Sequence, residues 1–199
     1  MRLEPRFASV ERAAGPLPWR TRPQGFAGLL QAVVAQQVSS AAAAAIWGRL
    51  RGVPGAVEPA GLLALPDDAL RGAGLSRPKV AHARALAGAF VSGRLDTGRL
   101  AALDDAEAVA AITAVRGLGP WTAEVYLLFA LGRADVFPAG DVALAGAAAD
   151  LFGLDARPGP QALRTLADAW RPHRALAARL LWHHWRFLTG RASMDDAAA

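Results

Sequence analysis

The hydropathy pattern is dominated by one long stretch without a charged residue. From residue 23 to residue 48 the side chains are apolar, small or uncharged polar, and glutamine and serine residues gather between positions 36 and 40. Such interruptions are typical of two helices of a globular protein and not of a membrane span. The pattern predicts a helix over residues 25–35, a break near Gln36–Val38, and a second helix, N-capped by Ser39, that reaches about Leu50.

Capping residues predict further helices along the chain. A short helix begins at Pro66-Asp67-Asp68 and ends at Gly72 and Gly74, a helical run covers Lys79–Val91, a capping box of Asp104 and Glu107 precedes Ala106–Val115, and Asp141 caps Val142–Phe152. Alanine and leucine are abundant while β-branched runs are scarce, so we expect an all-α protein. The segment before Gln24 is rich in proline, arginine and glycine and is expected to be irregular.

Charge and composition narrow the partner and the chemistry. The formal net charge is +5, and Lys79 is the only lysine, so the basic groups are almost all guanidinium groups that suit phosphate. The absence of cysteine excludes disulfides, a thiolate nucleophile, cysteine-ligated zinc and iron–sulfur clusters. The uncharged stretch lies too far from Met1, behind several charged residues, to be a signal peptide, so a cytoplasmic protein without a membrane partner is expected.

One glycine-rich segment carries candidate binding chemistry. Arg116-Gly117-Leu118-Gly119-Pro120 lies between two predicted helices. Two glycines followed by a proline at a helix start leave free backbone amides, which bind phosphate. A lone Gly-x-Gly is more often a tight turn with glycine as a helix C-cap, so the neighbouring residues decide between the two interpretations.

The neighbouring residues resemble a known superfamily. The run VRGLGPWTAEVYLLFALGRADVFPAGDVAL, residues 115–144, resembles the signature of helix-hairpin-helix DNA glycosylases, in which an aspartate, here Asp141, follows the hairpin. LLQAVVAQQVSSAAAA, GLSRPKVAHARALA and WRPHRALAARLLWHHW extend the likeness over about residues 25–186. The nearest group is bacterial 3-methyladenine DNA glycosylase II, without the N-terminal sheet domain of its longer members.

The resemblance implies a fold and a domain organisation. Two all-α lobes would surround a DNA-binding cleft with the hairpin and Asp141 at its mouth. Residues 1–24 would be an irregular segment packed on the core, residues 25–190 the helix-hairpin-helix glycosylase domain, and residues 191–199 a flexible tail. The partner would be duplex DNA containing damaged bases, and the protein a monomer.

The resemblance also implies chemistry that needs one carboxylate. Cleavage of an N-glycosidic bond builds positive charge on the sugar, which Asp141 would stabilise. A purine such as 3-methyladenine is already cationic and leaves without a strong general acid. Bifunctional relatives carry a lysine where this chain has Trp121, so we expect a monofunctional, hydrolytic enzyme of base excision repair without lyase activity. Asp135 is interpreted as a solvated or turn-stabilising carboxylate and Lys79 as a solvated charge.

The target base must be flipped out of the duplex, and further residues would serve that step. Gln36, Gln37 and Ser39 lie where related enzymes insert a side chain into the base stack. Gln37 holds the wedge position, where its amide would either bind the orphaned base or cap a helix. Backbone contacts are assigned to Gly117, Gly119 and Thr122, and a structural K⁺ or Na⁺ to the carbonyl groups of Thr113, Val115 and Leu118.

Tryptophans are the candidate pocket residues, because indole faces stack on cationic bases. Trp121 and Trp182 match pocket positions of the resembled family, Tyr126 and Trp185 are candidate pocket edges, and Trp47 and Trp170 are expected in the core. Adjacent residues such as His183 and His184 diverge by about 100° on a helix and chelate poorly, so no catalytic metal or other cofactor is predicted.

Three other functions stay open at this point. A damaged-DNA-binding protein without chemistry would share every DNA contact and differ only at Asp141. A glycosylase for uracil, hypoxanthine or etheno adducts would share the scaffold and differ in its pocket. A helical protein–protein scaffold would use the glycine-rich segment only as a turn.

Overall fold

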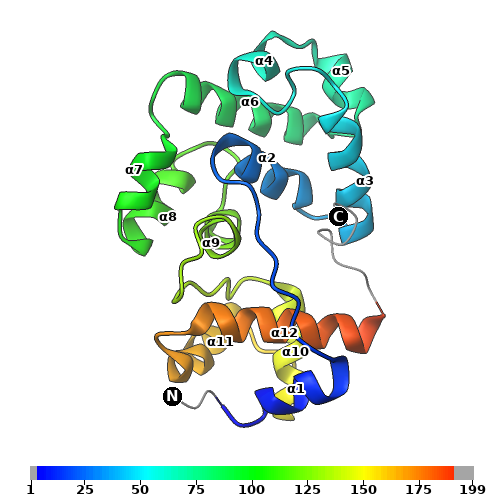
Figure 1. Ribbon diagram of the computed structural model, residues 1–199, viewed down its shortest axis with the longest axis vertical. Helices are drawn as coiled ribbons and strands as arrows, with labels where there is room; N and C mark the ends of the chain where they lie inside the picture. The colour runs from blue at the N-terminus through cyan, green and yellow to red at the C-terminus, as the bar shows by residue number, and fades with distance from the viewer. Residues whose placement is uncertain (1–3, 191–199) are drawn as a thin grey trace. The chain divides into compact units, whose positions relative to one another are not determined.

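Every regular element that the structure, a computed structural model, describes in residues 4–190 is helical (Figure 1). The chain forms two compact units. The continuous unit consists of residues 21–131, and the discontinuous unit combines residues 4–20 with residues 132–190. The chain therefore begins one unit, builds the whole of the other, and then completes the first.

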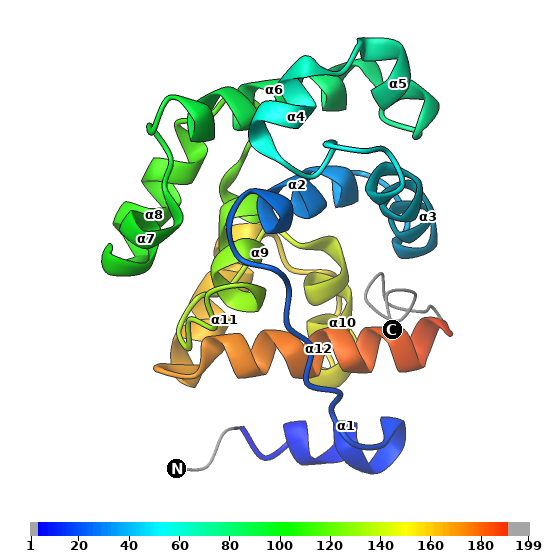
Figure 2. The ribbon, with the colours of Figure 1, turned by 45° about the horizontal axis from the view of Figure 1, so that its top comes forward.

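The continuous unit is built around one helix. Its helices are α2 (Gly25–Ala35), α3 (Ser40–Arg51), α4 (Pro59–Ala64), α5 (Asp67–Gly72), α6 (Arg77–Val91), α7 (Thr97–Ala102), α8 (Asp105–Thr113) and α9 (Pro120–Phe129). Helix α2 contacts α3, α6 and α9 (Figure 2), and its residues from Gly28 to Val34 are all buried. A helix buried on most sides cannot carry charge without a large desolvation cost, which explains why the α2 part of the uncharged stretch has no charged residue.

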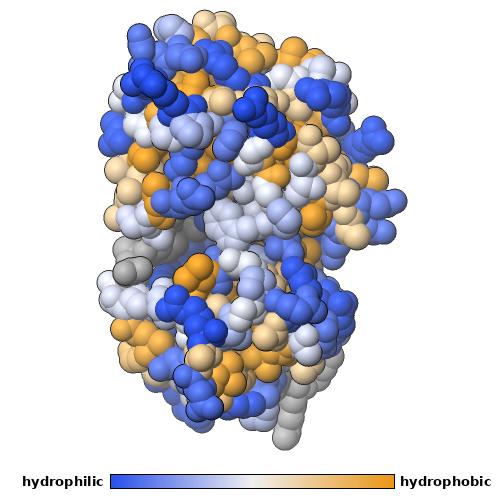
Figure 3. Space-filling model, turned by 180° about the vertical axis from the view of Figure 1, so that it is seen from behind, coloured by the Kyte–Doolittle hydropathy of each residue, from blue (hydrophilic) through white to orange (hydrophobic). Residues whose placement is uncertain are grey.

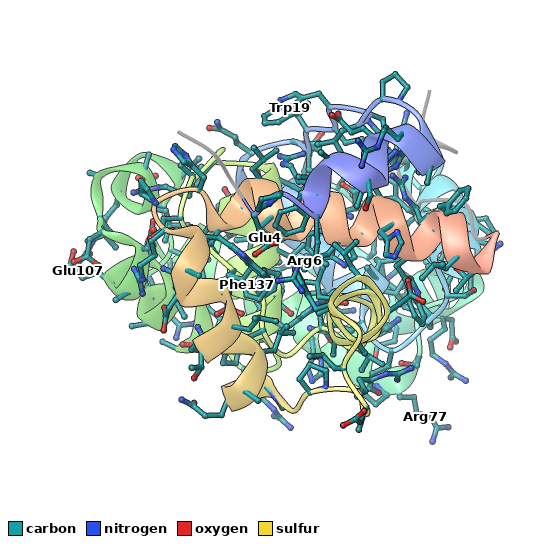
Figure 4. All side chains as sticks on the ribbon, turned by 90° about the horizontal axis from the view of Figure 1, so that it is seen from below. Glu4, Arg6, Trp19, Arg77, Glu107 and Phe137 are labelled. Carbon is teal, nitrogen blue, oxygen red and sulfur yellow. The ribbon has the colours of Figure 1, made fainter. Side chains whose placement is uncertain are left out.

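The discontinuous unit joins the N-terminal helix to the C-terminal ones. It contains α1 (Phe7–Ala14), α10 (Val142–Phe152), α11 (Pro160–Ala167), a 3₁₀ turn (Asp168–Trp170) and α12 (Arg174–Thr189). Helix α12 contacts both α1 and α10. The aromatic cluster of this unit contains Phe7, Phe137, Phe152 and Trp170. The ring centroids of Phe7 and Trp170 are 5.3 Å apart. Arg6 lies over the Phe152 ring at 4.4 Å and is labelled beside Phe137 in Figure 4.

Most of the predicted caps and helix limits are confirmed. The helices over residues 25–35 and 142–152 have the predicted bounds. The Ser39 hydroxyl accepts a hydrogen bond from the Ala42 amide at 3.2 Å, and both bonds of the predicted capping box at Asp104 are present. Helix α8 ends two residues earlier than predicted, because the chain turns into the hairpin after Thr113.

The expectation of an irregular N-terminal segment is wrong for residues 7–14. Phe7 and Val10 of α1 are buried, and α1 packs on α12. A helix of this length owes its stability to such tertiary packing more than to local propensity, and a sequence window does not show that packing. Helices α4, α7 and α11 were also not predicted, and the expected tail at residues 191–199 lies outside the described residues.

Two surface properties complete the description. Hydrophilic and hydrophobic residues are intermixed on the face drawn in Figure 3. Among residues 4–190 no helix combines the length and the apolar character that crossing a bilayer requires.

Candidate active site

The glycine-rich segment forms a tight hairpin between α8 and α9 in the continuous unit. Gly117 has a φ of 88°, and the ring of His82 from α6 occupies the place where a side chain at position 117 would begin. Val115 and Leu118 are buried, and the Leu118 amide donates to the Val115 carbonyl oxygen at 3.1 Å. The hairpin is therefore closely packed, needs glycine at position 117, and leads directly into the N-terminus of α9.

The loop between α2 and α3, residues 36–39, is fastened to this hairpin. The Gln36 amide nitrogen Nε2 donates to the Gly117 carbonyl oxygen at 3.1 Å and to the Thr122 hydroxyl oxygen at 2.9 Å. Thr122 is only 2% exposed. The structure thus brings together three residues predicted to bind DNA, and it uses the side chains of Gln36 and Thr122 inside the protein.

Gln37 has a different character from its neighbour. Its side chain is exposed, and its φ of 54° makes it the one non-glycine residue with positive φ within residues 4–190. The left-handed conformation costs an L-residue roughly 1–2 kcal/mol. Such strain is retained where the surrounding structure imposes it, and it clusters at functional sites. Ser39, by contrast, uses its hydroxyl to cap α3.

The expectation that Lys79 is a solvated charge is wrong. The residue is 9% exposed, and its Nζ donates to the Val34 carbonyl oxygen at 2.7 Å. That oxygen belongs to the last turn of α2, where carbonyl groups lack helical partners and attract a cation. Burial lowers the pKa of the Lys79 ammonium group. The only lysine of the chain therefore supports α2 directly before the loop at residues 36–39.

Asp141 lies in the discontinuous unit as the N-cap of α10, as predicted. Its Oδ1 accepts hydrogen bonds from the Ala143 amide at 2.8 Å and the Leu144 amide at 3.0 Å. Its own amide donates to the Pro138 carbonyl oxygen at 2.9 Å. The carboxylate is partly exposed. One oxygen therefore orients the group while the carboxylate keeps contact with solvent.

Helix α10 is held against α12 by an indole. A Cβ added to Gly146 would lie 2.5 Å from Cζ3 of Trp185, so glycine is what allows the Trp185 ring to lie on α10. The Arg157 guanidinium lies 5.8 Å from the centroid of the same ring. Trp182, one turn earlier on α12, is partly exposed. The packing of Trp185 thus fixes the helix that carries Asp141.

The two adjacent histidines have separate partners. His183 Nε2 lies 2.9 Å from the Gly15 carbonyl oxygen, and His184 Nε2 lies 2.7 Å from Asp150 Oδ2. Within the part of the chain that the structure describes, no group of three or more His, Cys, Asp or Glu residues is arranged to hold a metal ion. The histidines join α12 to the N-terminal segment and to α10.

The other candidate pocket residues divide into core and partly exposed positions. Tyr126 is 1% exposed, and its hydroxyl accepts a hydrogen bond from the Gly25 amide at 2.9 Å. Burial raises the pKa of this hydroxyl. The structure therefore gives Tyr126 a core position in the continuous unit. Trp121 is partly exposed at the start of α9, while Trp47 and Trp170 are buried in the core as predicted.

Asp135 is the centre of an ion-pair cluster. Arg174 donates to it through Nε at 2.8 Å and Nη2 at 3.0 Å, and Arg171 donates through Nη1 at 3.0 Å. Burial alone would raise the pKa of Asp135, but the bonds from Arg174 outweigh it and lower that pKa. Of the two expected roles, that of a solvated carboxylate is therefore wrong. Asp135 does lie in a turn, and through Arg171 and Arg174 it fixes the start of α12.

Comparison with known proteins identifies the superfamily. Residues 30–172 match the family described as HhH-GPD superfamily base excision DNA repair protein. The chain belongs to the HhH-GPD superfamily. The all-α helix-hairpin-helix glycosylase fold that the sequence implied is thereby confirmed. His82 and Lys79, which support the hairpin and the loop of this HhH-GPD protein, were missed because nothing in a single sequence marks a buried supporting cation or ring.

Relatives and solved structures of the superfamily give the closer comparison. DNA-3-methyladenine glycosylase 1 of Schizosaccharomyces pombe is 30% identical over 77% of this chain and 69% of its own length. The alkylbase DNA glycosidase-like protein mag2 of the same yeast is 24% identical over 90% of this chain and 88% of its own. The structure of the S. pombe 3-methyladenine DNA glycosylase in complex with abasic DNA has a TM-score of 0.83 at 27% identity, covering 92% of this chain and 91% of that one. A Bacillus halodurans DNA-3-methyladenine glycosidase has a TM-score of 0.77 at 34% identity, covering 96% and 90%.

Proposed function

We propose that this protein is a monofunctional DNA glycosylase that hydrolyses the N-glycosidic bond of alkylated purines, of the 3-methyl and 7-methyl type, in duplex DNA. The observation that carries the proposal is Asp141, a partly exposed carboxylate held by two backbone amides at the N-terminus of α10. It follows the hairpin in a chain whose relatives are named 3-methyladenine DNA glycosylases. The product would be an abasic site for later steps of base excision repair.

Asp141 is the proposed catalytic residue. As the purine leaves, positive charge develops on the sugar, and a carboxylate placed against it stabilises that charge electrostatically. The amides of Ala143 and Leu144 hold Oδ1 in a fixed direction, so little reorganisation is needed during the reaction. An alkylated purine carries its own positive charge, so no second carboxylate is required. Water would then complete the hydrolysis.

The hairpin is proposed to bind the DNA backbone without reading sequence. Gly117 and Gly119 offer backbone amides at the start of α9. Three neutral carbonyl oxygens of the same segment, those of Thr113, Val115 and Leu118, have the donor chemistry that a K⁺ or Na⁺ ion requires. The Val115 oxygen already accepts the Leu118 amide and keeps a second lone pair for an ion. Such an ion would bridge the hairpin to a phosphate.

Hydrolysis without strand cleavage is proposed on the basis of lysine chemistry. A lyase of this superfamily would need an amine close to the hairpin, where this chain has Trp121. The only lysine, Lys79, is buried with its ammonium group on the Val34 carbonyl oxygen. We infer that Trp121 and Trp182, both partly exposed, instead provide indole faces for a cationic base.

The proposal is tested by base release. Methylated genomic DNA and duplex oligonucleotides with single 7-methylguanine, 1,N6-ethenoadenine, hypoxanthine or uracil lesions are incubated with the purified protein, and free bases are separated by chromatography. Release of 3-methyl or 7-methyl purines, with strands intact until alkali treatment, is expected. Release of only another lesion would replace the proposed substrate class. Salt-sensitive binding without release of any base would indicate a damage-binding protein.

A further inference from the structure

One side chain joins two segments that are far apart in the sequence. The loop at residues 36–39 follows α2, and the hairpin precedes α9, more than 80 residues later. The amide group of Gln36 has two protons, and its two bonds go to Gly117 and Thr122, one on each side of the turn into α9. A DNA-facing role would require this amide to point outward, whereas its donors are already used inside the protein.

We propose that Gln36 is a positioning residue that makes the loop at residues 36–39 and the hairpin one rigid body. In this arrangement, a side chain that the loop inserts into the base stack enters at a fixed distance from the hairpin atoms that bind the DNA backbone. Gln36 then acts through its neighbours without touching the substrate. The proposal rests on the glycosylase function proposed above, because only an enzyme that flips a base needs this coupling.

Two side chains of α6 support the same two segments. Lys79 donates to the Val34 carbonyl oxygen in the last turn of α2, two residues before Gln36. His82, one turn further along α6, lies with its ring against Gly117 of the hairpin. The last turn of α2 and the hairpin therefore both contact α6, and Gln36 links the loop to the hairpin. Chains of packed and hydrogen-bonded groups of this kind hold a functional geometry within a fraction of an ångström.

The residue that this network positions is Gln37. It is exposed, and its left-handed backbone is the kind of strained conformation that only a constrained neighbour can impose. The constraint comes from the preceding residue. The Gln36 side chain is fixed by two hydrogen bonds, and the backbone amide of Gln36 donates to the Val33 carbonyl oxygen at 3.2 Å. Without the Gln36 anchor, Gln37 would relax toward an ordinary conformation and leave the inserting position.

Misplacement of this kind affects the chemical step more than binding. Contacts with the DNA backbone supply most of the affinity for a duplex, and they do not depend on where the loop tip points. The flipped state, in contrast, depends on the tip filling the gap. A displacement of about 1 Å by a distant change can cost on the order of a hundredfold in rate.

The test compares two substitutions of Gln36 with a charge-matched control. Gln36→Leu removes both donors and keeps the size of the side chain. Gln36→Glu is close in shape, and its carboxyl group can donate one hydrogen bond only when it is protonated. Gln24→Glu places the same new charge at the exposed N-cap of the same helix, where the side chain makes no capping bond.

Gln36→Leu is expected to lower the single-turnover rate of base release at saturating enzyme by about tenfold to a hundredfold. Its Kd for undamaged duplex is expected to rise by a smaller factor than the rate falls, because phosphate contacts supply most of the affinity and the substitution removes none of them. For Gln36→Glu, the rate relative to wild type should rise as the pH is lowered from about 8 toward about 5, as the carboxyl group gains its proton. For Gln24→Glu the same ratio should stay flat. Should Gln36→Leu not fold, the pH profile of Gln36→Glu decides alone.

Two results would overturn the proposal. Wild-type rates in Gln36→Leu would show that the bridge has no role in the reaction. A loss of duplex affinity that equals the loss of release, with an unchanged rate at saturation, would make Gln36 a direct DNA contact.

An independent readout separates this proposal from the proposed function. If the wild-type protein releases no base, the glycosylase proposal fails. The network is then judged by hydrogen exchange in the free protein. The Leu118 amide, which closes the hairpin on Val115, should exchange faster in Gln36→Leu than in wild type, and equal exchange would refute the coupling.

Discussion

Replacing Asp141 by asparagine and by alanine separates the two roles that we assign to this carboxylate. Asparagine retains an oxygen for the amides of Ala143 and Leu144 and removes the charge. Alanine removes the charge and the cap together. We therefore expect the two variants to lose the same factor in the rate of base release and to differ in their loss of folding stability.

The magnitudes follow from the geometry at the start of α10. Removing a preorganised electrostatic group from an active site costs about 10²–10³-fold in rate, or roughly 2.7–4 kcal/mol, and both variants should lose at least this much. Asn and Asp cap helices about equally well, while an alanine at an N-cap costs about 1 kcal/mol. For a protein of this size, 1 kcal/mol corresponds to a fall in Tm of roughly 2–4 °C.

Three measurements on each variant are sufficient. Single-turnover release of methylated purines gives the chemical rate, fluorescence anisotropy with undamaged duplex gives Kd, and thermal unfolding gives Tm. Asp104→Ala is the matched control, because Asp104 caps α8 through the same kind of bond, from the Glu107 amide at 2.8 Å. This control should lose stability as Asp141→Ala does and keep its rate of base release.

Two outcomes would refute this reasoning. If Asp141→Asn releases base within about tenfold of the wild-type rate, the carboxylate does not supply the electrostatic stabilisation assigned to it. If Asp141→Ala is as stable as Asp141→Asn, the two hydrogen bonds at the start of α10 do not contribute to folding. The first result would affect the function and the second only the cap.

Three further substitutions test the framework around the site. Gly146→Ala should destabilise the protein by about 1–3 kcal/mol in urea unfolding, because the new methyl group meets Trp185. Gly88→Ala in α6, where a Cβ meets nothing within 4 Å, should not destabilise the protein. Equal effects of the two substitutions would contradict the packing argument. Gly117→Ala should lower Tm, since it combines a φ of 88° with a clash against His82, while Gly48→Ala in α3, where a Cβ meets nothing within 4 Å, should not lower it. Asp135→Asn should cost roughly 1–3 kcal/mol at pH 7. Because the folded pKa of Asp135 is lowered, its stabilisation is present above the unfolded pKa of about 3.9 and is lost as the pH falls through the folded value, so wild type and Asp135→Asn should converge in acid. A difference that is constant with pH would contradict the ion pairs.

Local signals made part of this structure predictable from the sequence. The bounds of α2 and α10 follow from a run of apolar residues and from the cap at Asp141, and both are properties of neighbouring residues. Ser39 and the capping box at Asp104 are of the same kind. The hairpin was recognisable because glycine permits the positive φ that other residues rarely adopt, and because proline fixes its own φ and suits the first turn of a helix.

The rest depends on contacts between residues distant in the sequence. Lys79 was expected in solvent because lysine is usually exposed, and only the placement of α6 beside the end of α2 gives its ammonium group a carbonyl partner. Tyr126 was expected at a pocket edge, and the amide of Gly25, 101 residues away, makes it a core residue. The two bonds of Gln36 are equally invisible in the sequence, where the residue is one of two adjacent glutamines.

The order in which the two units occur along the chain has a consequence for synthesis. All described residues of the continuous unit lie between positions 21 and 131, so the hairpin and its supporting helix are complete before Asp141 has been made. Domains generally fold as units while the chain emerges. The hairpin proposed to bind DNA would therefore emerge from the ribosome first, and α1 could pack on α12 only after α12 had been made. If the hairpin binds phosphate as proposed above, a nascent chain that stops between these events would contain the DNA-binding segment and would lack the carboxylate proposed for catalysis.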